Sequence, residues 1–194
     1  MKAIKINLII VLVLVFGFAV QAQEKYEIVP QAGLITIEGS SNTSDWKLTS
    51  HDLTGDAQLF VADGMVKNVA RVIIDVDGNT IRNIMNRRMT KKAQRTLKVS
   101  EYPEITFFAY GFAQDADGNR KMKGTISMAG ENSDILFDFS TRIQDDVVWV
   151  VAETDSKFSA FGLEPPTDFG GAVKCKDEIR IEIQLPFELP KVKD

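Results

Sequence analysis

The 194-residue chain has only one cysteine and one histidine, and this scarcity limits the disulfides, metal sites and catalytic sites that it can form. A single thiol, Cys175, cannot form a disulfide within the chain, so the fold must draw its stability from an apolar core. A single histidine, His51, offers no cluster of metal-binding or catalytic groups, and a surface or turn position is the favoured interpretation. We therefore predict no metal site, and we interpret Cys175 as a thiol without a redox partner.

Catalytic signatures are also lacking. The sequence contains no Gly-x-Ser-x-Gly, no phosphate-binding loop and no dinucleotide-binding fingerprint. Two acidic stretches, 75–79 and 115–119, are similar to calcium loops, but neither has the glutamate that such a loop needs, so both are interpreted as hairpin turns. We predict that the protein is not an enzyme and needs no cofactor. Hydrolysis that depends on His51 or Asp168 is the remote alternative.

Only one long hydrophobic run is present, and it lies at the start of the chain. Lys2 and Lys5 precede the apolar run 9–20, and small residues follow it. This order predicts a signal peptide at 1–22 that is removed before Gln23, with an uncleaved membrane anchor as the alternative. Because no cysteine lies near the cut, we expect a periplasmic or secreted protein rather than a lipoprotein. Residues 23–194 are then of a size for one domain.

Charge is unevenly distributed. Removal of residues 1–22, which contain two lysines and no acidic residue, changes the formal net charge from −4 to −6. An acidic body of this kind excludes a general affinity for nucleic acid. Residues 81–98 nevertheless carry seven basic side chains and no acidic one. We interpret Arg87, Arg88, Lys91 and Lys92 either as a solvated helix face or as a surface for transient contact with anionic lipid headgroups.

The pattern of hydrophobic residues predicts a mainly β protein with one helix. Apolar residues recur at three and four residue steps over 80–98, which is typical of an amphipathic helix. Elsewhere they alternate with polar residues in short segments separated by turn signals. An antiparallel sheet of this size tends to close, and we predict a single antiparallel β-barrel of about eight strands. The predicted strands are 26–29, 33–39, 45–49, 57–61, 65–76, 104–112, 121–129, 134–140, 147–152 and 179–187. Residues 158–173 are predicted as a long ordered loop or lid.

Several motifs, taken in order, resemble those of the YceI-like family over essentially the whole chain after residue 22. They are Glu101-Tyr102-Pro103-Glu104-Ile105-Thr106-Phe107, Lys123-Gly124-Thr125-Ile126-Ser127-Met128-Ala129-Gly130 and Thr167-Asp168-Phe169-Gly170. Two further stretches, 85–97 and 161–166, are similar to a branch of that family. The resemblance implies an exported, lipocalin-like antiparallel barrel whose interior binds a long apolar molecule, a polyisoprenoid or related lipid.

The residues themselves suggest where such a molecule would lie. Flexible methionine and flat phenylalanine suit an elongated ligand, although the same alternation is typical of a packed core. We predict a lining composed of Phe107, Met122, Ile126, Met128, Phe137, Phe139, Trp149, Ile181 and Ile183. Two functions are expected. The first is an exported protein that sequesters or carries an isoprenoid, an isoprenoid quinone or a similar lipid; the second is an envelope stress or adhesion factor with a filled barrel.

Overall fold

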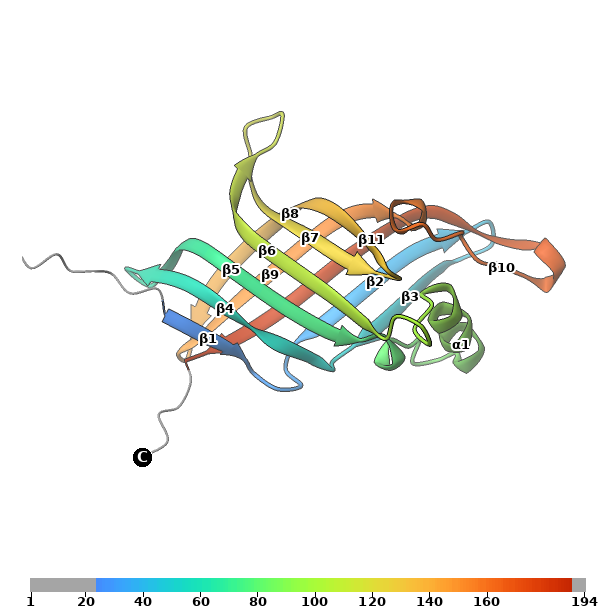
Figure 1. Ribbon diagram of the computed structural model, residues 1–194, viewed down its shortest axis with the longest axis horizontal. Helices are drawn as coiled ribbons and strands as arrows, with labels where there is room; N and C mark the ends of the chain where they lie inside the picture. Colours follow the sequence, from blue (N-terminus) through green and yellow to red (C-terminus); the bar gives the residue numbers. More distant parts are fainter. Residues whose placement is uncertain (1–23, 190–194) are drawn as a thin grey trace, which may run out of the picture.

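The computed structural model describes residues 24–189. Within that range it contains eleven strands, one α-helix and three short 3₁₀ helices (Figure 1). The strands are β1 (Glu24–Ile28), β2 (Leu34–Ser41), β3 (Asp45–Ser50), β4 (Leu53–Ala62), β5 (Met65–Asp77), β6 (Glu104–Gln114), β7 (Arg120–Met128), β8 (Glu131–Gln144), β9 (Val147–Lys157), β10 (Thr167–Asp168) and β11 (Val173–Glu188). The helices are η1 (Gly78–Thr80), α1 (Arg87–Thr96), η2 (Phe158–Phe161) and η3 (Phe169–Gly171). The predicted signal peptide, 1–22, lies outside the described residues.

Eight of these strands close into a ring, which confirms the predicted antiparallel barrel. Neighbouring strands follow the order β1-β4-β5-β6-β7-β8-β9-β11, and β1 also pairs with β11. Closure leaves no open edge on these strands, and an open edge is where sheets tend to aggregate. The β2–β3 hairpin lies outside this ring order, because β2 pairs with β11 and β3 pairs with β2. It extends the wall toward the end of the barrel that carries α1 (Figure 1).

Alternation along each strand fills the inside of the barrel. On β7, Met122, Ile126 and Met128 are buried, whereas Lys123 between them is exposed. The buried apolar side chains of the described residues form one continuous cluster that includes every strand of the ring. Full burial of one large aliphatic side chain contributes about 1.5–3 kcal/mol, so this cluster supplies the stability that a disulfide cannot.

A bulge on β6 changes which side chains enter that cluster. Ala109 pairs with Gly124 and Phe112 pairs with Met122, so β6 uses one more residue than β7 over this stretch. Gly111 takes φ +61°, a left-handed conformation that glycine adopts without strain. Phe112 therefore packs against the interior, although a strict two-residue period would have placed it on the outer face with Phe108.

The helix is shorter than predicted, because α1 begins at Arg87 rather than near residue 80. Ile81 is buried in an extended conformation, and Arg82 forms a β-bridge with Thr49. The helix then starts where the Asn86 side chain accepts a hydrogen bond from the Met89 backbone N–H. Of the apolar residues in 80–86 only Ile81 reaches the core, and Ile84 and Met85 are exposed, so their spacing does not reflect a buried helix face. The asparagine is the signal that marks the helix start.

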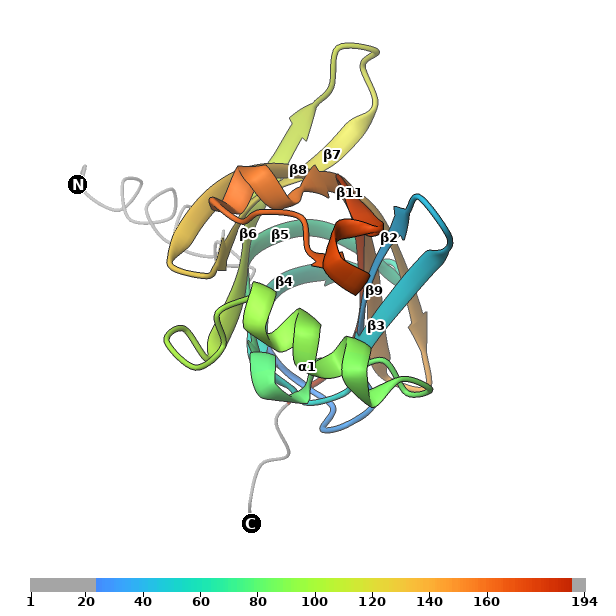
Figure 2. The same ribbon diagram turned by 90° about the vertical axis from the view of Figure 1, so that its right-hand side faces the viewer.

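One end of the barrel is covered by several segments that are far apart in the sequence. Figure 2 shows α1, the segment from η2 to η3 and the β2–β3 hairpin around this end. The region predicted as a loop or lid, 158–173, contains η2, β10 and η3. No helix within residues 24–189 is long and apolar enough to cross a membrane.

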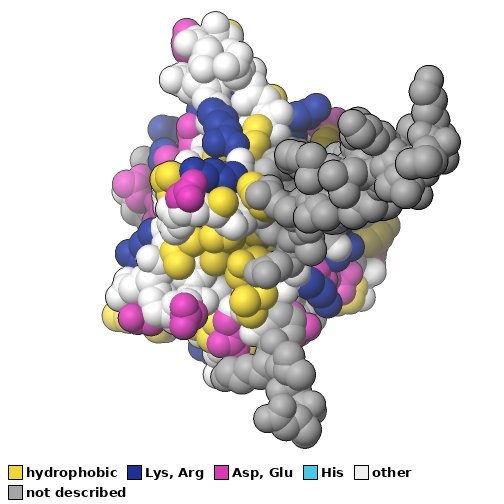
Figure 3. Space-filling model, turned by 90° about the vertical axis from the view of Figure 1, so that its left-hand side faces the viewer, with side chains coloured by type: hydrophobic (Ala, Val, Ile, Leu, Met, Phe, Trp, Pro, Cys, Tyr) yellow, Lys and Arg dark blue, Asp and Glu magenta, His cyan; other side chains and the backbone are white. Residues whose placement is uncertain are grey.

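The opposite end carries the β4–β5 and β8–β9 hairpins (Figure 1). Figure 3 shows hydrophobic side chains gathered at this end between charged ones. Val61, Val66 and Ile143, which lie beside these hairpins, are partly buried against the core. The two ends therefore differ, since one is covered by a helix and a lid and the other is formed by hairpins.

Candidate functional site

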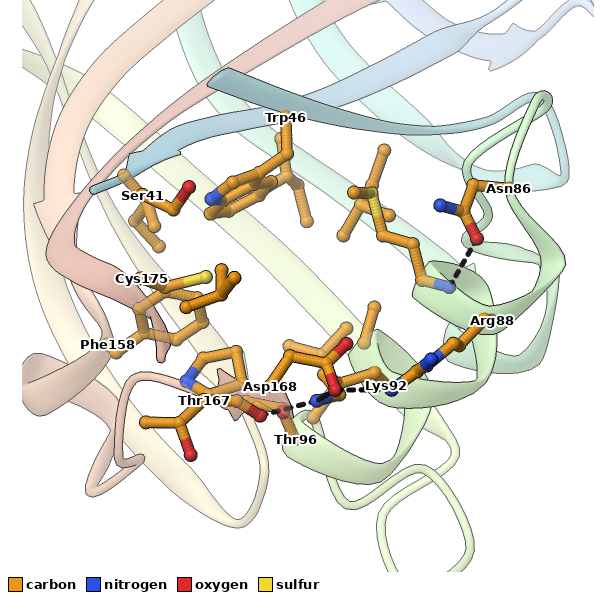
Figure 4. A pocket seen from close by; sticks show the side chains of 18 of the residues that line it. Ser41, Trp46, Asn86, Arg88, Lys92, Thr96, Phe158, Thr167, Asp168 and Cys175 are labelled. Atoms are coloured by element: carbon orange, nitrogen blue, oxygen red, sulfur yellow. Dashed lines mark hydrogen bonds and ion pairs between the residues drawn. The ribbon is translucent and has the colours of Figure 1, made fainter. Parts of the chain in front are cut away.

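A pocket of about 190 Å³ opens at the end of the barrel that α1 covers. Its walls come from the β2–β3 hairpin, α1, and the chain between η2 and β11 (Figure 4). Most of the lining is apolar, and the polar groups lie mainly in the segments that surround the opening. Such an arrangement suits a ligand with an apolar body, because only a few polar groups are needed to orient it.

Trp46 on β3 forms one wall, and a glycine holds it there. Trp46 pairs across the hairpin with Gly39, and a Cβ at Gly39 would lie 2.2 Å from the Trp46 Cζ2 atom. Only glycine therefore lets the indole ring lie flat across β2. The ring also meets Phe158, with 6.0 Å between the ring centroids. A glycine opposite a tryptophan thus fixes the aromatic side of the pocket.

The indole N–H of Trp46 is a buried donor beside Cys175. It makes no hydrogen bond of ordinary geometry to any residue from 24 to 189. Burial raises the pKa of the Cys175 thiol, while the Lys92 charge and the nearby Trp46 indole N–H act in the other direction. Cys175 is thus a protonated, weakly nucleophilic thiol in the pocket wall.

The inner face of α1 forms the second wall. Ala93 and Leu97 are buried, and Met89 is partly buried against the core. These positions are four residues apart, so they share one side of the helix. The small side chain of Ala93 faces the pocket and leaves space there.

The third wall is tied to α1 by Asp168. The Asp168 carboxylate accepts a hydrogen bond from Arg88 at 2.6 Å and lies 3.0 Å from Lys92 Nζ. Lys92 also donates to the Thr167 carbonyl oxygen. Lys92, the Phe169 backbone N–H and Arg88 lower the pKa of Asp168 to about 2. The carboxylate therefore stays ionised at neutral pH, and we call this set of contacts the Asp168 latch.

Eight of the nine predicted lining residues fall into three groups. Met128 lines the pocket. Six others are buried among the packed core rather than around this cavity: Phe107, Met122, Ile126, Phe137, Ile181 and Ile183. Phe139 is partly buried and stacks on Phe112, with 5.0 Å between the ring centroids.

Trp149 does not face the interior, so its place in the predicted lining is wrong. Val148 and Val150 on either side of it are buried, which puts Trp149 on the outer face of β9. The Arg142 guanidinium lies over its ring at 5.0 Å. Both faces of this strand carry apolar residues, so the sequence pattern could not distinguish inside from outside.

The four basic residues singled out from the sequence divide into two pairs. Arg88 and Lys92 line the pocket mouth and hold the Asp168 latch. Arg87 and Lys91 are exposed and form no ion pair within the described part of the chain. All four lie on α1 and carry the same charge, so contact with Asp168 is what distinguishes the two pairs.

Several pocket residues were missed. Trp46, Phe158 and Met89 were assigned to a strand, a loop and a helix, but not to the site. Asp168 is the acidic residue of the Thr167-Asp168-Phe169-Gly170 motif. Its charge is opposite to that of the basic segment 81–98, and this was the one signal in the sequence that could have paired it with the helix. Pairing these segments required knowing that α1 folds over the end of the barrel.

Two features set aside in the sequence have structural roles. His51 Nδ1 donates to the Gly33 carbonyl oxygen at 2.8 Å. In the 115–119 turn the Asp115 carboxylate accepts hydrogen bonds from the backbone N–H groups of Asp117 and Asn119. The Asn119 side-chain amide, which also donates to this carboxylate, and the two backbone N–H groups lower the pKa of Asp115, and these bonds are those of a hairpin turn.

A model of the YceI-like domain matches residues 26–187, which span the barrel and the pocket. The chain belongs to the YceI-like family. A comparison with curated proteins found no match.

Solved structures of other proteins share this YceI-like fold. BcnA from Burkholderia cenocepacia is 12% identical, with a TM-score of 0.66 over 82% of this chain and 98% of that one. A polyisoprenoid-binding domain from Saccharophagus degradans, implicated in plant cell wall breakdown, is 12% identical, with a TM-score of 0.64 over 85% and 98%. The YceI protein of Campylobacter jejuni is 19% identical, with a TM-score of 0.54 over 76% and 82%.

Proposed function

We propose that the protein is an exported binding protein, not an enzyme, that holds the apolar chain of an isoprenoid or similar lipid in the pocket beneath α1. The observation that carries the proposal is the pocket itself, which combines apolar walls with polar groups at the mouth. Membership of the YceI-like family supports it, as does the likeness to a domain described as polyisoprenoid-binding. The predicted signal peptide supports export.

The size of the pocket limits how much of a lipid it holds at once. Its volume is about 190 Å³. An apolar cavity of about 150 Å³ is large enough for benzene, so the pocket accommodates a ring or a short piece of an isoprenoid chain. A longer chain would have to displace side chains at the floor and along α1. Met128 and Met89 are suited to this, because methionine is unbranched and adapts its shape.

A ligand with an acceptor at its polar end would satisfy a donor in the pocket wall. The Trp46 N–H is buried there beside the Cys175 sulfur, which is only a weak acceptor. A quinone carbonyl or an alcohol oxygen could accept from it, whereas a pure hydrocarbon could not. We therefore favour a lipid with an oxygen at or near its head.

The experiment is a titration of residues 23–194 with an isoprenoid quinone and with a polyprenol. The barrel closes within 24–189, so this chain retains the whole ring. Met128→Arg places an unpaired charge in the floor of the pocket and is expected to weaken binding at least about tenfold. Leu136→Arg is the matched control, because Leu136 is exposed on β8 and away from the pocket lining.

Ala93→Leu keeps the floor intact and fills part of the pocket from α1, so it should also weaken binding. Circular dichroism of each variant shows whether the barrel is folded. Unchanged affinity in both folded variants would overturn the proposed site. If the unmodified chain binds neither lipid, the filled-barrel alternative, in which the protein acts through its surface, becomes the better account.

A further inference from the structure

Three large apolar side chains are exposed beside the pocket mouth. Ile84 is 78% exposed, Met85 is 93% exposed and Phe169 is 69% exposed. Ile84 and Met85 lie immediately before α1, while Phe169 opens η3 in the lid. Both segments lie at the end of the barrel that α1 covers (Figure 2). An exposed apolar side chain is unremarkable alone, but a group of them around a binding site indicates contact with a partner.

The backbone holds these side chains outward. Asn83 Nδ2 donates to the Lys47 carbonyl oxygen at 2.9 Å, and Asn83 Oδ1 accepts from the Met85 N–H at 3.0 Å. The Asn83 N–H donates to Thr90 on α1. The turn that presents Ile84 and Met85 is therefore fixed to both β3 and the helix.

Phe169 has a backbone conformation that is unfavourable for a phenylalanine. Its φ is +49°, in the left-handed region that a bulky side chain rarely adopts. The Asp168 carboxylate accepts from the Phe169 N–H at 2.8 Å, and the Arg88 guanidinium lies 4.7 Å from the centre of its ring. A strained residue that keeps an aromatic ring exposed is a feature more typical of a functional surface than of a loop without a role.

The charge around these side chains has one sign. Arg87, Lys91 and Arg95 lie four residues apart along α1, are exposed, and form no ion pair with the residues that the structure describes. Asp168, the acidic residue that contacts the helix, is already neutralised by Arg88 and Lys92. Exposed apolar side chains beside these cations are complementary to an anionic membrane surface. The apolar side chains can enter the membrane interface while the cations contact the anionic headgroups.

We infer that this end of the molecule docks on an anionic lipid bilayer, with Ile84 and Met85 entering the interface and Arg87, Lys91 and Arg95 contacting headgroups. Docking in this orientation turns the pocket mouth toward the bilayer, so a lipid could pass between membrane and pocket without crossing water. Membrane docking does not require that the pocket bind a lipid. The proposed docking and the proposed lipid binding can therefore fail separately.

The test is flotation of residues 23–194 with lipid vesicles. One set is phosphatidylcholine alone and the other is an equimolar mixture with phosphatidylglycerol. We expect flotation with the anionic vesicles only, and less of it as salt rises. Arg87→Gln/Lys91→Gln/Arg95→Gln should lower the partition coefficient on the order of 100-fold, at roughly a fivefold loss for each cation. Ile84→Ser/Met85→Ser should lower it roughly tenfold or more.

The matched control carries Met65→Ser and Leu136→Ser, which are also exposed but lie away from α1, and it should float like the unmodified chain. Equal flotation with both vesicle types, flotation with neither, or no loss in the two rim variants would overturn the inference. None of the rim substitutions touches the pocket lining. Lipid titration in solution is therefore a separate readout, and it should be unchanged in both rim variants.

Discussion

At the scale of single residues, the pocket depends on a few side chains whose positions are set by a neighbour. Gly39 has no side chain, and this lets the Trp46 ring lie across β2. Lys92, the Phe169 backbone N–H and Arg88 lower the pKa of Asp168 to about 2. Burial raises the pKa of the Cys175 thiol. In each case the neighbour, not the residue type alone, decides the property that matters for binding.

Gly39→Ala tests the first of these dependencies. The new Cβ would lie 2.2 Å from Trp46 Cζ2, so the indole must leave its place in the pocket wall. We expect a loss of about 1–3 kcal/mol in the free energy of unfolding, together with weaker lipid binding and a shifted emission of Trp46. Emission is measured in a Trp149→Phe background, which leaves Trp46 as the sole tryptophan of the chain.

Gly33→Ala is the matched control for Gly39→Ala. The nearest atom to its new Cβ would be the flexible end of Ile28 at 3.2 Å, so the pocket should be unaffected. Equal emission and equal lipid affinity in the two alanine variants would show that Gly39 does not position Trp46.

At the scale of elements, the Asp168 latch connects the lid to α1. The pKa of Asp168 is lowered to about 2 in the folded protein, below its ordinary value of about 3.9. A carboxylate with a lowered pKa stabilises the folded state at pH values above the ordinary one, and this contribution is lost as the pH falls through about 2. The latch is therefore constant through neutral pH and is not a switch in the range where histidine titrates.

Asp168→Asn should lower the unfolding temperature at neutral pH by no more than a few degrees, because the pair is partly solvated. The difference from the unmodified chain should shrink as the pH falls from about 4 and disappear below about pH 2. Thermal unfolding across this range measures it. Asp52→Asn serves as the control, since the Asp52 side chain forms no ion pair among the described residues. A difference that persists unchanged at pH 2 would contradict the latch.

The strands and the helix also show which parts of the fold could be predicted from the sequence. The strand segments were predicted because their alternation reflects a barrel with one packed face. Asp63 and Gly64, both at positive φ, form the turn between β4 and β5 and are turn signals of the kind that separated the predicted strands. The predicted start of α1 was wrong because Ile81 lies in an extended segment, although its spacing from the later apolar residues is that of a helix. The prediction that Trp149 lines the interior was wrong because β9 carries apolar residues on both faces, so the sequence did not show which face points inward.

The site was less predictable than the fold for a physical reason. A pocket between α1, the lid and the β2–β3 hairpin depends on contacts between segments as far apart as Trp46 and Cys175. Local periodicity carries no information about such contacts. The predicted lining was taken from the barrel interior, and most of that interior proved to be packed core around Ile126 and Ile181.

At the scale of the whole molecule, the barrel has two unlike ends. The end under α1 combines the pocket, the lid, exposed apolar side chains and cations that form no ion pair within residues 24–189. At the end with the β4–β5 and β8–β9 hairpins, the described part of the chain forms no helix (Figure 1). The proposed carrier, which would meet a membrane at one end and keep its packed core behind the pocket, would explain this polarity. The acidic remainder of the surface would keep the rest of the molecule away from anionic lipid.

The most direct measurement is native mass spectrometry of the protein purified from its own host after export, followed by organic extraction. We predict a chain that begins at Gln23 and carries one lipid per molecule, and we predict that the solvent releases an oxygen-containing isoprenoid or similar lipid. A clean mass without an adduct, and no uptake of isoprenoid quinones or polyprenols offered afterwards, would contradict the account of the barrel as a lipid-binding protein.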